Sequence, residues 1–344
     1  MMLAALLAIL AVVFLAPFLF RKVERNLETF LFVMGLLAVL ASRVADVHLA
    51  AQALVEPIKI SLAVLVFGLV FKFTRAYAHR QLQGILHRVP LSAFVFLVVV
   101  ALGLLSGVIT AIIASLLLVE LVGALGLSRK AAVRLTIIAC FAIGLGAALT
   151  PLGEPLSTLA IAKLKGEPHH ASFFFLARLL GIYIIPGIIA LGILAALLLR
   201  SGARGDGLGE KEMSESVPHA LARAGKTYLF VMALILLGEG FRPVIDSYVV
   251  NWGGGVLYWA NITSAALDNA TLTAAEISPL MTAFQIKSAL VALLVSGGML
   301  IPGNIPNIVS AGKLRISSRE WARLGVPLGM AMMLTYFAVL QLLG

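Results

Sequence analysis

Two acidic side chains stand where long apolar stretches of the chain are interrupted. Glu154 follows a Pro- and Gly-containing break at residues 150–153, and Asp268 lies in the middle of an apolar block that contains no Lys or Arg. A charge inside a membrane span costs roughly 2.5–3.5 kcal/mol on insertion scales unless it is paired or faces a cavity. Carboxylates bind hard cations and also take up protons. We therefore expect Asp268 and Glu154 to hold a cation such as Na⁺, or a proton, at a polar site within apolar sequence.

Hydroxyl and amide side chains near the same interruptions complete the expected site, because hard monovalent cations are bound by oxygen atoms. The candidate ligands are Asp268, Glu154, Asn269, Thr271, Asn304, Ser106 and Thr150, with bare backbone carbonyls beside Gly153 and Gly303. A structural alternative remains open. Glu154 and Asp268 could cap the N-termini of broken helices, where acids are favourable, and the two asparagines could satisfy broken backbone.

Four further ionisable residues are candidates for coupling cation movement to proton movement: Lys287, Glu276, Glu239 and Glu120. Lys287 either pairs with Asp268 or Glu276 or extends along apolar surface to the membrane interface, and we favour the second interpretation. Glu239 and Glu120 lie inside apolar stretches, which makes them candidates for a proton path.

The interrupted apolar stretch occurs twice, at residues 144–155 and 296–307. A shift of 150 residues aligns 153–164 with 303–314 without a gap, and both segments end in Lys-Leu. Proline removes an amide donor and clashes with the preceding turn, so both helices should break. Freed backbone groups cannot face lipid. A pair of Pro- and Gly-interrupted segments at matching places in two halves indicates a transporter binding site.

The composition is typical of a polytopic α-helical membrane protein. Of 344 residues, 61% are apolar and only 12% are charged, which leaves room for roughly 8–11 spans of about 20 residues. The net charge of +10 does not indicate nucleic-acid binding, because the basic residues fall in short loops between apolar runs. The single cysteine excludes an intrachain disulfide and cysteine metal clusters. Neither a nucleophile–base spacing nor an HExxH motif occurs, so we expect no enzyme and no cofactor.

Two blocks are predicted to be hairpins. The block at 89–127, interrupted at Ser106-Gly107, has basic residues at both ends, and a hairpin puts both on the cytoplasmic side; one straight crossing is the alternative. The block at 250–281 lacks Lys and Arg, and its first arm of about 11 residues reaches only half of the hydrocarbon thickness. A re-entrant hairpin from the outer face follows. With both hairpins, the basic loops are cytoplasmic and both termini are extracytoplasmic in the cell (inner) membrane.

The order of predicted elements is repeated: helix, hairpin, broken helix, helix. The second copy starts on the opposite side of the membrane, which is an inverted-topology repeat. The predicted divisions are N-terminal scaffold helices at 1–48, a first repeat at 49–200, a cytoplasmic linker at 201–225 and a second repeat at 226–344.

The pairing of hairpin tips with broken helices resembles the ion transporter superfamily. Residues 266–271 look like the acidic hairpin-tip motif of its D-type sodium/proton antiporters, and residues 303–311 with 318–321 look closest to a poorly characterised family described as putative cation transporters. The resemblance implies a homodimeric, elevator-type carrier whose hairpin tips and helix breaks form the site. Anion symporters of the group carry Ser-Asn-Thr at both tips. The first tip here, residues 106–110, and Asp268 at the second both depart from that pattern.

These observations predict a secondary active transporter that exchanges Na⁺ or a similar monovalent cation for protons by alternating access in the lipid bilayer. Two carboxylates repel an anionic substrate, and proton competition at one site is sufficient for antiport. The alternative is Na⁺-coupled symport of a small anion, with Lys287 and half-helix N-termini on the anion and Asp268 on Na⁺. A passive channel is a third class, and opposed hairpins favour alternating access over it.

Overall fold

The computed structural model describes residues 2–20, 22–23, 26–58, 61–62, 65–66, 90–199, 217–265 and 269–343. Within these ranges every regular element is a helix. Asp268, the later part of the predicted third helix and most of the predicted linker at 201–225 lie outside the described residues. The α-helices are α1 (Met2–Leu19), α3 (Leu27–Ser42), α5 (Leu91–Ile109), α6 (Ala111–Ala124), α7 (Arg129–Ala147), α8 (Pro155–Lys163), α9 (Phe175–Leu198), α10 (Val217–Ser247), α11 (Gly254–Ala260), α12 (Asn269–Glu276), α13 (Ala283–Gly297), α14 (Ile305–Leu314) and α15 (Ser318–Leu343).

Five described helices are long and apolar enough to cross a membrane: α5, α7, α9, α15 and residues Ala224–Ser247 of α10. Four shorter apolar segments lie in α1, α3, α6 and α13. The predicted polytopic, all-α architecture is therefore confirmed. The outward faces of α9 and α15 carry large exposed apolar side chains, which suit contact with lipid rather than water. They include Ile182, Ile189, Ile193, Leu197, Leu334 and Leu342.

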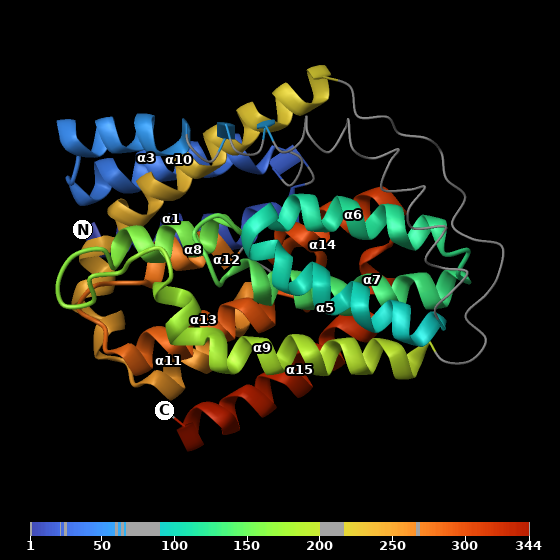
Figure 1. The fold of residues 1–344 in the computed structure, drawn as a ribbon. Coiled ribbons are helices and arrows are strands. Elements are labelled where there is room, and N and C mark those ends of the chain that lie inside the picture. The colour runs from blue at the N-terminus through green and yellow to red at the C-terminus, as the bar shows by residue number, and fades with distance from the viewer. Residues whose placement is uncertain are drawn as a thin grey trace.

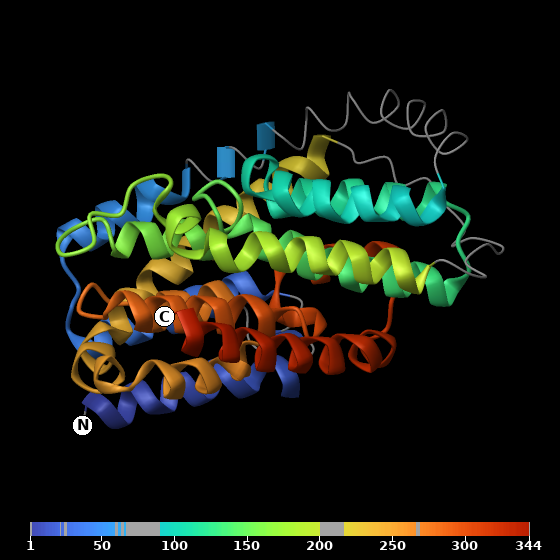
Figure 2. The ribbon, with the colours of Figure 1, turned by 60° about the horizontal axis from the view of Figure 1, so that its bottom comes forward.

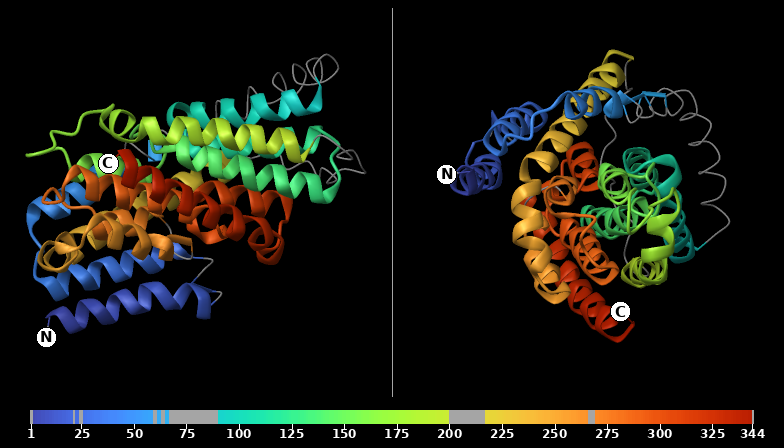
Figure 3. Two further views of the ribbon diagram at one scale, coloured as in Figure 1. Left: turned by 90° about the horizontal axis from the view of Figure 1, so that it is seen from below. Right: turned by 90° about the vertical axis from the view of Figure 1, so that its left-hand side faces the viewer.

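The N-terminal helices lie at the side of the molecule. Viewed end-on, α1 and α3 stand apart from the main cluster and contact it through α10 (Figure 3, right). A separate apolar core joins these three helices and includes Leu6, Leu31 and Phe241. The contact between α3 and α10 is close because Gly35 and Gly240 each face backbone of the other helix, and small residues allow such approach between membrane helices.

The block at 89–127 turns back on itself. Helices α5 and α6 run side by side in opposite directions and meet at Thr110 (Figure 1). One straight helix through this block is therefore wrong. The predicted interruption at Ser106-Gly107 is also wrong, because these two residues lie in the last turn of α5. The turn is at Thr110, whose φ of 76° ends α5, and its hydroxyl accepts a hydrogen bond from the Ile113 amide at 3.4 Å.

Both predicted helix breaks are present. The first separates α7 from α8, and the second separates α13 from α14, with a short 3₁₀ turn, η3 (Ile301–Gly303), between them. α7 reaches the centre from one end of the bundle and α13 from the other (Figure 1). The start of α1 and the end of α15 lie at the same end as the start of α13 (Figure 1).

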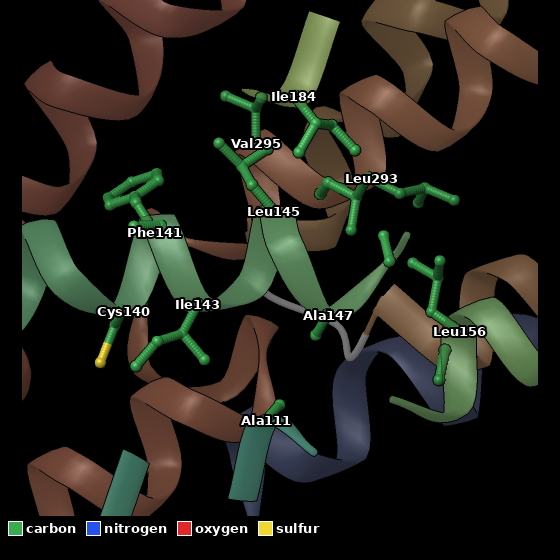
Figure 4. Packing of buried hydrophobic residues seen from close by; sticks show 14 of the residues in the cluster. Ala111, Cys140, Phe141, Ile143, Leu145, Ala147, Leu156, Ile184, Leu293 and Val295 are labelled. Carbon is green, nitrogen blue, oxygen red and sulfur yellow. The ribbon is translucent and has the colours of Figure 1, made fainter. Parts of the chain in front are cut away.

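The two halves of the chain pack across one another at the centre. α6 packs on α14, and α12 packs on α8, so each short helix after a break contacts a helix from the other half. α15 lies along α13 (Figure 2). Apolar side chains of α7 fill the space around the first break, where Leu145 and Ala147 lie near Leu293 and Val295 of α13 (Figure 4). The breaks are thus enclosed by protein, as freed backbone in a membrane protein requires.

Candidate functional site at two helix breaks

The first break is a tight turn that only glycine permits. α7 ends at Ala147, and α8 begins at Pro155, whose missing N–H is no loss at a first helical position. A Cβ on Gly153 would lie 1.9 Å from the Ala147 carbonyl oxygen. The Gly153 carbonyl accepts a hydrogen bond of 2.8 Å from the amide of Ala111, the first residue of α6. Gly153 therefore lets the tip of the α5–α6 pair approach the break closely.

The second break has the same backbone form. Asn304 precedes α14 with φ −154° and ψ 147°, and Glu154 precedes α8 with φ −156° and ψ 163°. A Cβ on Gly303 would lie 2.5 Å from the Ser264 carbonyl oxygen and 2.6 Å from that of Gly297. At both Gly153 and Gly303, the missing side chain thus lets another backbone segment approach closely.

The side chains at the two N-cap positions do not cap their helices. Asn is among the best N-cap residues because its oxygen accepts from the N2 or N3 amide. Here N2 of α14 is Pro306, and the N3 amide of Asn307 donates to the Asn304 carbonyl at 3.2 Å instead. Asn304 Oδ1 is buried without a hydrogen-bond partner among the described residues. Glu154, 5% exposed, makes no side-chain cap bond either, so neither residue closes the start of its helix with a side-chain hydrogen bond.

Hydroxyl groups bind the turn between α5 and α6, the first tip, to the first break. Ser106 Oγ on α5 lies 2.9 Å from the Ile143 carbonyl oxygen and 2.6 Å from that of Gly103, and donates toward both. Thr150 Oγ1 donates to the Gly107 carbonyl and accepts from the Leu152 amide at 3.3 Å. Both predicted ligands lie at the break, but their hydroxyl protons bind backbone carbonyls.

Serines that were not predicted do the same at the second break. Ser264 lies in the 3₁₀ turn η2 (Asn261–Ala265) after α11, and its hydroxyl donates to the Leu293 carbonyl at 3.2 Å. Ser296 on α13 donates to the Asn261 carbonyl at 2.7 Å. Sequence reasoning overlooked both because each bond joins residues about thirty positions apart. The 150-residue shift was the available signal, since it aligns Leu293 with Ile143.

Ser157 and Asn307, which were also not predicted, lie in the first turn of α8 and α14, the helices that follow the two breaks. Asn307 Nδ2 donates to the carbonyls of Gly297 and Leu300, both at 2.8 Å. At the position 150 residues earlier, Ser157 Oγ lies 3.4 Å from the Ala147 carbonyl and 2.8 Å from that of Glu154. Each side chain therefore ties the end of the preceding helix to the start of the next.

The two breaks touch each other. A Cβ on Gly144 of α7 would lie 2.4 Å from Asn304 Nδ2, and a Cβ on Gly298 would meet the Phe141 ring. Asn269 and Thr271 are buried at the start of α12, which packs on α8. Asn269 Nδ2 has no hydrogen-bond partner in the described part of the chain. Glu154, Asn304, Ser106 and Thr150 thus lie at the two contacting breaks, and Asn269 and Thr271 are buried on a helix that packs on α8.

The four coupling candidates lie away from this centre. The Lys287 ammonium stands over the rings of Tyr183 and Phe284, 5.8 and 6.0 Å from their centroids, and among the described residues it makes no ion pair. The less favoured alternative of an ion pair with Glu276 is therefore not seen, and Glu276 instead accepts from Asn261 Nδ2 at 2.7 Å. The remaining two are Glu239, which pairs with Arg242 at 3.3 Å, and Glu120, which is half-buried on α6.

A polar cavity of about 170 Å³ lies between α10 and the far ends of α8 and α12. Its charged lining residues are Glu56, Lys163, Glu239, Arg242 and Asp246. Burial lowers the pKa of Lys163, the last residue of α8, to about 8, and the nearby Glu239 partly offsets this. Burial also raises the pKa of Glu276, the last residue of α12, to about 7. This cavity begins about one helical turn beyond the break, since Leu159 of α8 lines it.

Fold and composition together define a multi-pass α-helical membrane protein with five candidate spans in the described ranges. Residues 3–343 match the model of a family described as "Protein of unknown function (DUF1646)", and because the match covers nearly the whole chain, the protein belongs to this family. Comparison with curated proteins gives no significant match.

Proposed function

We propose that the protein is a secondary active transporter that exchanges Na⁺ or a similar monovalent cation for protons by alternating access. The observation that carries this proposal is the pair of N-cap side chains that do not cap. Asn304 presents a buried acceptor oxygen, and Glu154 a buried carboxylate, at two breaks that contact each other. Asn304 Oδ1 has no hydrogen-bond partner among the described residues, and an acceptor oxygen without a donor favours a cation over an anion.

A buried carboxylate explains why protons would compete with the cation. Charge in a low-dielectric interior is unfavourable unless a counter-charge or a proton neutralises it. Glu154 can be neutralised by either, and so can Asp268, a sequence-predicted ligand outside the described residues. One site that is alternately loaded with cation or proton is sufficient for exchange.

Matching contacts around the two breaks support an inverted repeat. Three contacts recur with the same register, in which break residues are shifted by 150 positions and tip residues by 158. The contact of Ser106 with Ile143 matches that of Ser264 with Leu293. The contact of Gly103 with Gly146 matches that of Asn261 with Ser296. The contact of Ser157 with Ala147 matches that of Asn307 with Gly297. The opposed directions of α7 and α13 (Figure 1) support an inverted orientation of the second copy, which is the organisation of many secondary transporters.

The same reasoning extends the proposal to topology and assembly. In it, the α5–α6 pair and the α11–α12 pair are re-entrant hairpins, α1 and α3 are scaffold, and both termini are extracytoplasmic in the cell membrane. The start of α7 lies at the end of the bundle opposite the termini (Figure 1), and α7 begins with Arg129 and Lys130, which supports this orientation under the positive-inside rule. Membership of the ion transporter superfamily and a homodimer rest on the sequence resemblance.

The proposal is tested in liposomes that contain the purified protein. An imposed pH gradient should drive Na⁺ against its own gradient, with both ions followed at once. Glu154→Gln and Asp268→Asn should each abolish the pH-driven Na⁺ flux, while Glu120→Gln, which changes a carboxylate away from the breaks, should affect it less. Na⁺ flux that is insensitive to pH in the native protein would contradict the proposal.

Na⁺-coupled symport of a small anion is the second candidate, and one observation favours it. The N-termini of α8 and α14 follow the breaks, and the first residue of α6 donates to the Gly153 carbonyl; helix N-termini attract anions. Asn269 Nδ2, at the start of α12, is a buried donor without a partner among the described residues. In the same liposomes, Na⁺ uptake that begins only when an anion is supplied would favour this function.

A further inference from the structure

Asn307 carries a buried oxygen atom that no group in the described part of the chain satisfies. Its side chain is fully buried at the third position of α14, directly beneath the second break. Its Nδ2 is fully used, because it donates to the carbonyls of Gly297 and Leu300. Its Oδ1 has no hydrogen-bond partner there. A buried polar atom without a partner is uncommon and requires an explanation.

The orientation of this amide is fixed by its surroundings. Exchanging Nδ2 and Oδ1 would bring the amide oxygen against two carbonyl oxygens, which is repulsive. The unpaired atom is therefore an acceptor, and its missing partner is a donor or a cation.

A second unpaired acceptor lies three residues earlier in the chain. Asn304 is the extended N-cap residue of α14, so its side chain lies at the same break as that of Asn307. Its Oδ1 also lacks a partner within the described ranges. A helix N-terminus normally supplies donors to such oxygens, but Pro306 has none and the Asn307 amide is engaged by the Asn304 carbonyl.

The corresponding position at the first break has a smaller group. Ser157 ties the Ala147 carbonyl as Asn307 ties that of Gly297. Serine suffices for this tie, so the longer amide at position 307 adds something that the tie does not need: an acceptor oxygen inside the break.

We propose that Asn307 is a direct ligand of the transported cation through Oδ1, together with Oδ1 of Asn304, so that the cation is held at the second break. The inference rests on the proposed function and assigns its cation to one of the two breaks. Glu154 at the first break then serves mainly as the proton-accepting group.

The test is a thermal unfolding series of the purified full-length protein in choline chloride and in rising concentrations of NaCl, LiCl and KCl. A ligand that binds only the folded state raises the melting temperature in a concentration-dependent way. We expect Na⁺ to stabilise the native protein relative to choline. Asn307→Ser, which copies Ser157, should need about tenfold or more Na⁺ than the native protein for the same rise in melting temperature above its value in choline. Ser157→Ala, the matched change at the first break, should lower the melting temperature in choline and leave the rise produced by each Na⁺ concentration unchanged.

A second variant separates a ligand from a backbone tie. Asn307→Asp keeps the acceptor oxygens and loses the donors to Gly297 and Leu300, so it should fold poorly in choline and recover strongly with Na⁺. This variant decides the question if Asn307→Ser does not fold. Loss of stability in both variants with no change in the Na⁺ response would mean that water satisfies Oδ1, and would overturn the inference. A native protein that responds to no cation would overturn the proposed function as well.

Discussion

The two helix breaks have nearly the same backbone but different side-chain chemistry. Both have glycine at the point of closest approach, an extended N-cap residue and proline in the first helical turn. The first break carries a carboxylate, Glu154, and hydroxyls whose protons bind carbonyls. The second has hydroxyls of the same kind, and in addition two amides whose oxygens have no hydrogen-bond partner in the described part of the chain. The duplicated backbone thus provides the same scaffold twice, whereas the side chains proposed to accept the proton and to hold the cation differ between the two copies.

The largest expected effect comes from adding a methyl group at a break. Gly153→Ala would bring a Cβ within 1.9 Å of the Ala147 carbonyl, so the backbone must move. Overpacking of this kind costs about 1–3 kcal/mol, occasionally more. We expect the melting temperature in detergent to fall more for Gly153→Ala than for Gly303→Ala, whose nearest carbonyl is 2.5 Å away. Gly312→Ala, with open space around it, is the control, and equal melting temperatures for all three variants would contradict the packing.

Contact between the breaks gives the next prediction. Gly144→Ala places a Cβ where Asn304 Nδ2 now lies, and a flexible amide end can move without loss of the fold. We expect a nearly unchanged melting temperature in choline and an increase of about three- to tenfold in the Na⁺ concentration for half-maximal transport. An unchanged Na⁺ dependence would show that the first break does not position the Asn304 amide.

The serines that fasten the two tips allow a matched comparison. Ser106→Ala and Ser264→Ala each remove one buried hydrogen bond to a carbonyl of the neighbouring helix, at Ile143 and Leu293 respectively. Each should cost about 1–3 kcal/mol, because the carbonyl loses its partner. Similar losses of unfolding free energy, measured in denaturant or by heating, would support the structural equivalence of the two helix breaks. A loss for only one of the two variants would contradict it.

The smallest expected effect is the pH dependence contributed by Glu276. Its pKa in the fold is about 7, above the ordinary value of 4.5, because burial disfavours the carboxylate. The folded protein therefore holds a proton that the unfolded chain releases between about pH 4.5 and 7, and stability falls as the pH rises through that window. Glu276→Gln keeps an acceptor for Asn261 and should remove this fall, as melting curves from pH 4 to 8 would show. A variant with the native pH profile would rule out Glu276 as its source.

The helix breaks could be predicted from the sequence because proline and glycine act locally. Pro155 and Pro306 stand in the first turn of the helix after each break, and the repeated pattern of glycine and proline aligned the two breaks. Proline alone would not have been enough, because Pro186 lies inside α9. The turn at Thr110 could not be predicted, since nothing in a threonine indicates a positive φ that the neighbouring break imposes. The tie made by Asn307 also depends on a carbonyl ten residues away across a break. Lys287 illustrates the same limit, because its aromatic neighbour Tyr183 comes from a distant helix.

The most direct test of cation/proton exchange is the reverse of a pH-driven flux measurement. Liposomes containing the protein are loaded with Na⁺, diluted into choline at equal pH, and followed with a trapped pH dye. Cation/proton exchange predicts that outward Na⁺ movement acidifies the lumen and that an added Na⁺ gradient of opposite sign reverses the pH signal. Glu154→Gln should give no pH signal. Outward Na⁺ movement through the native protein without any change in luminal pH would contradict cation/proton exchange.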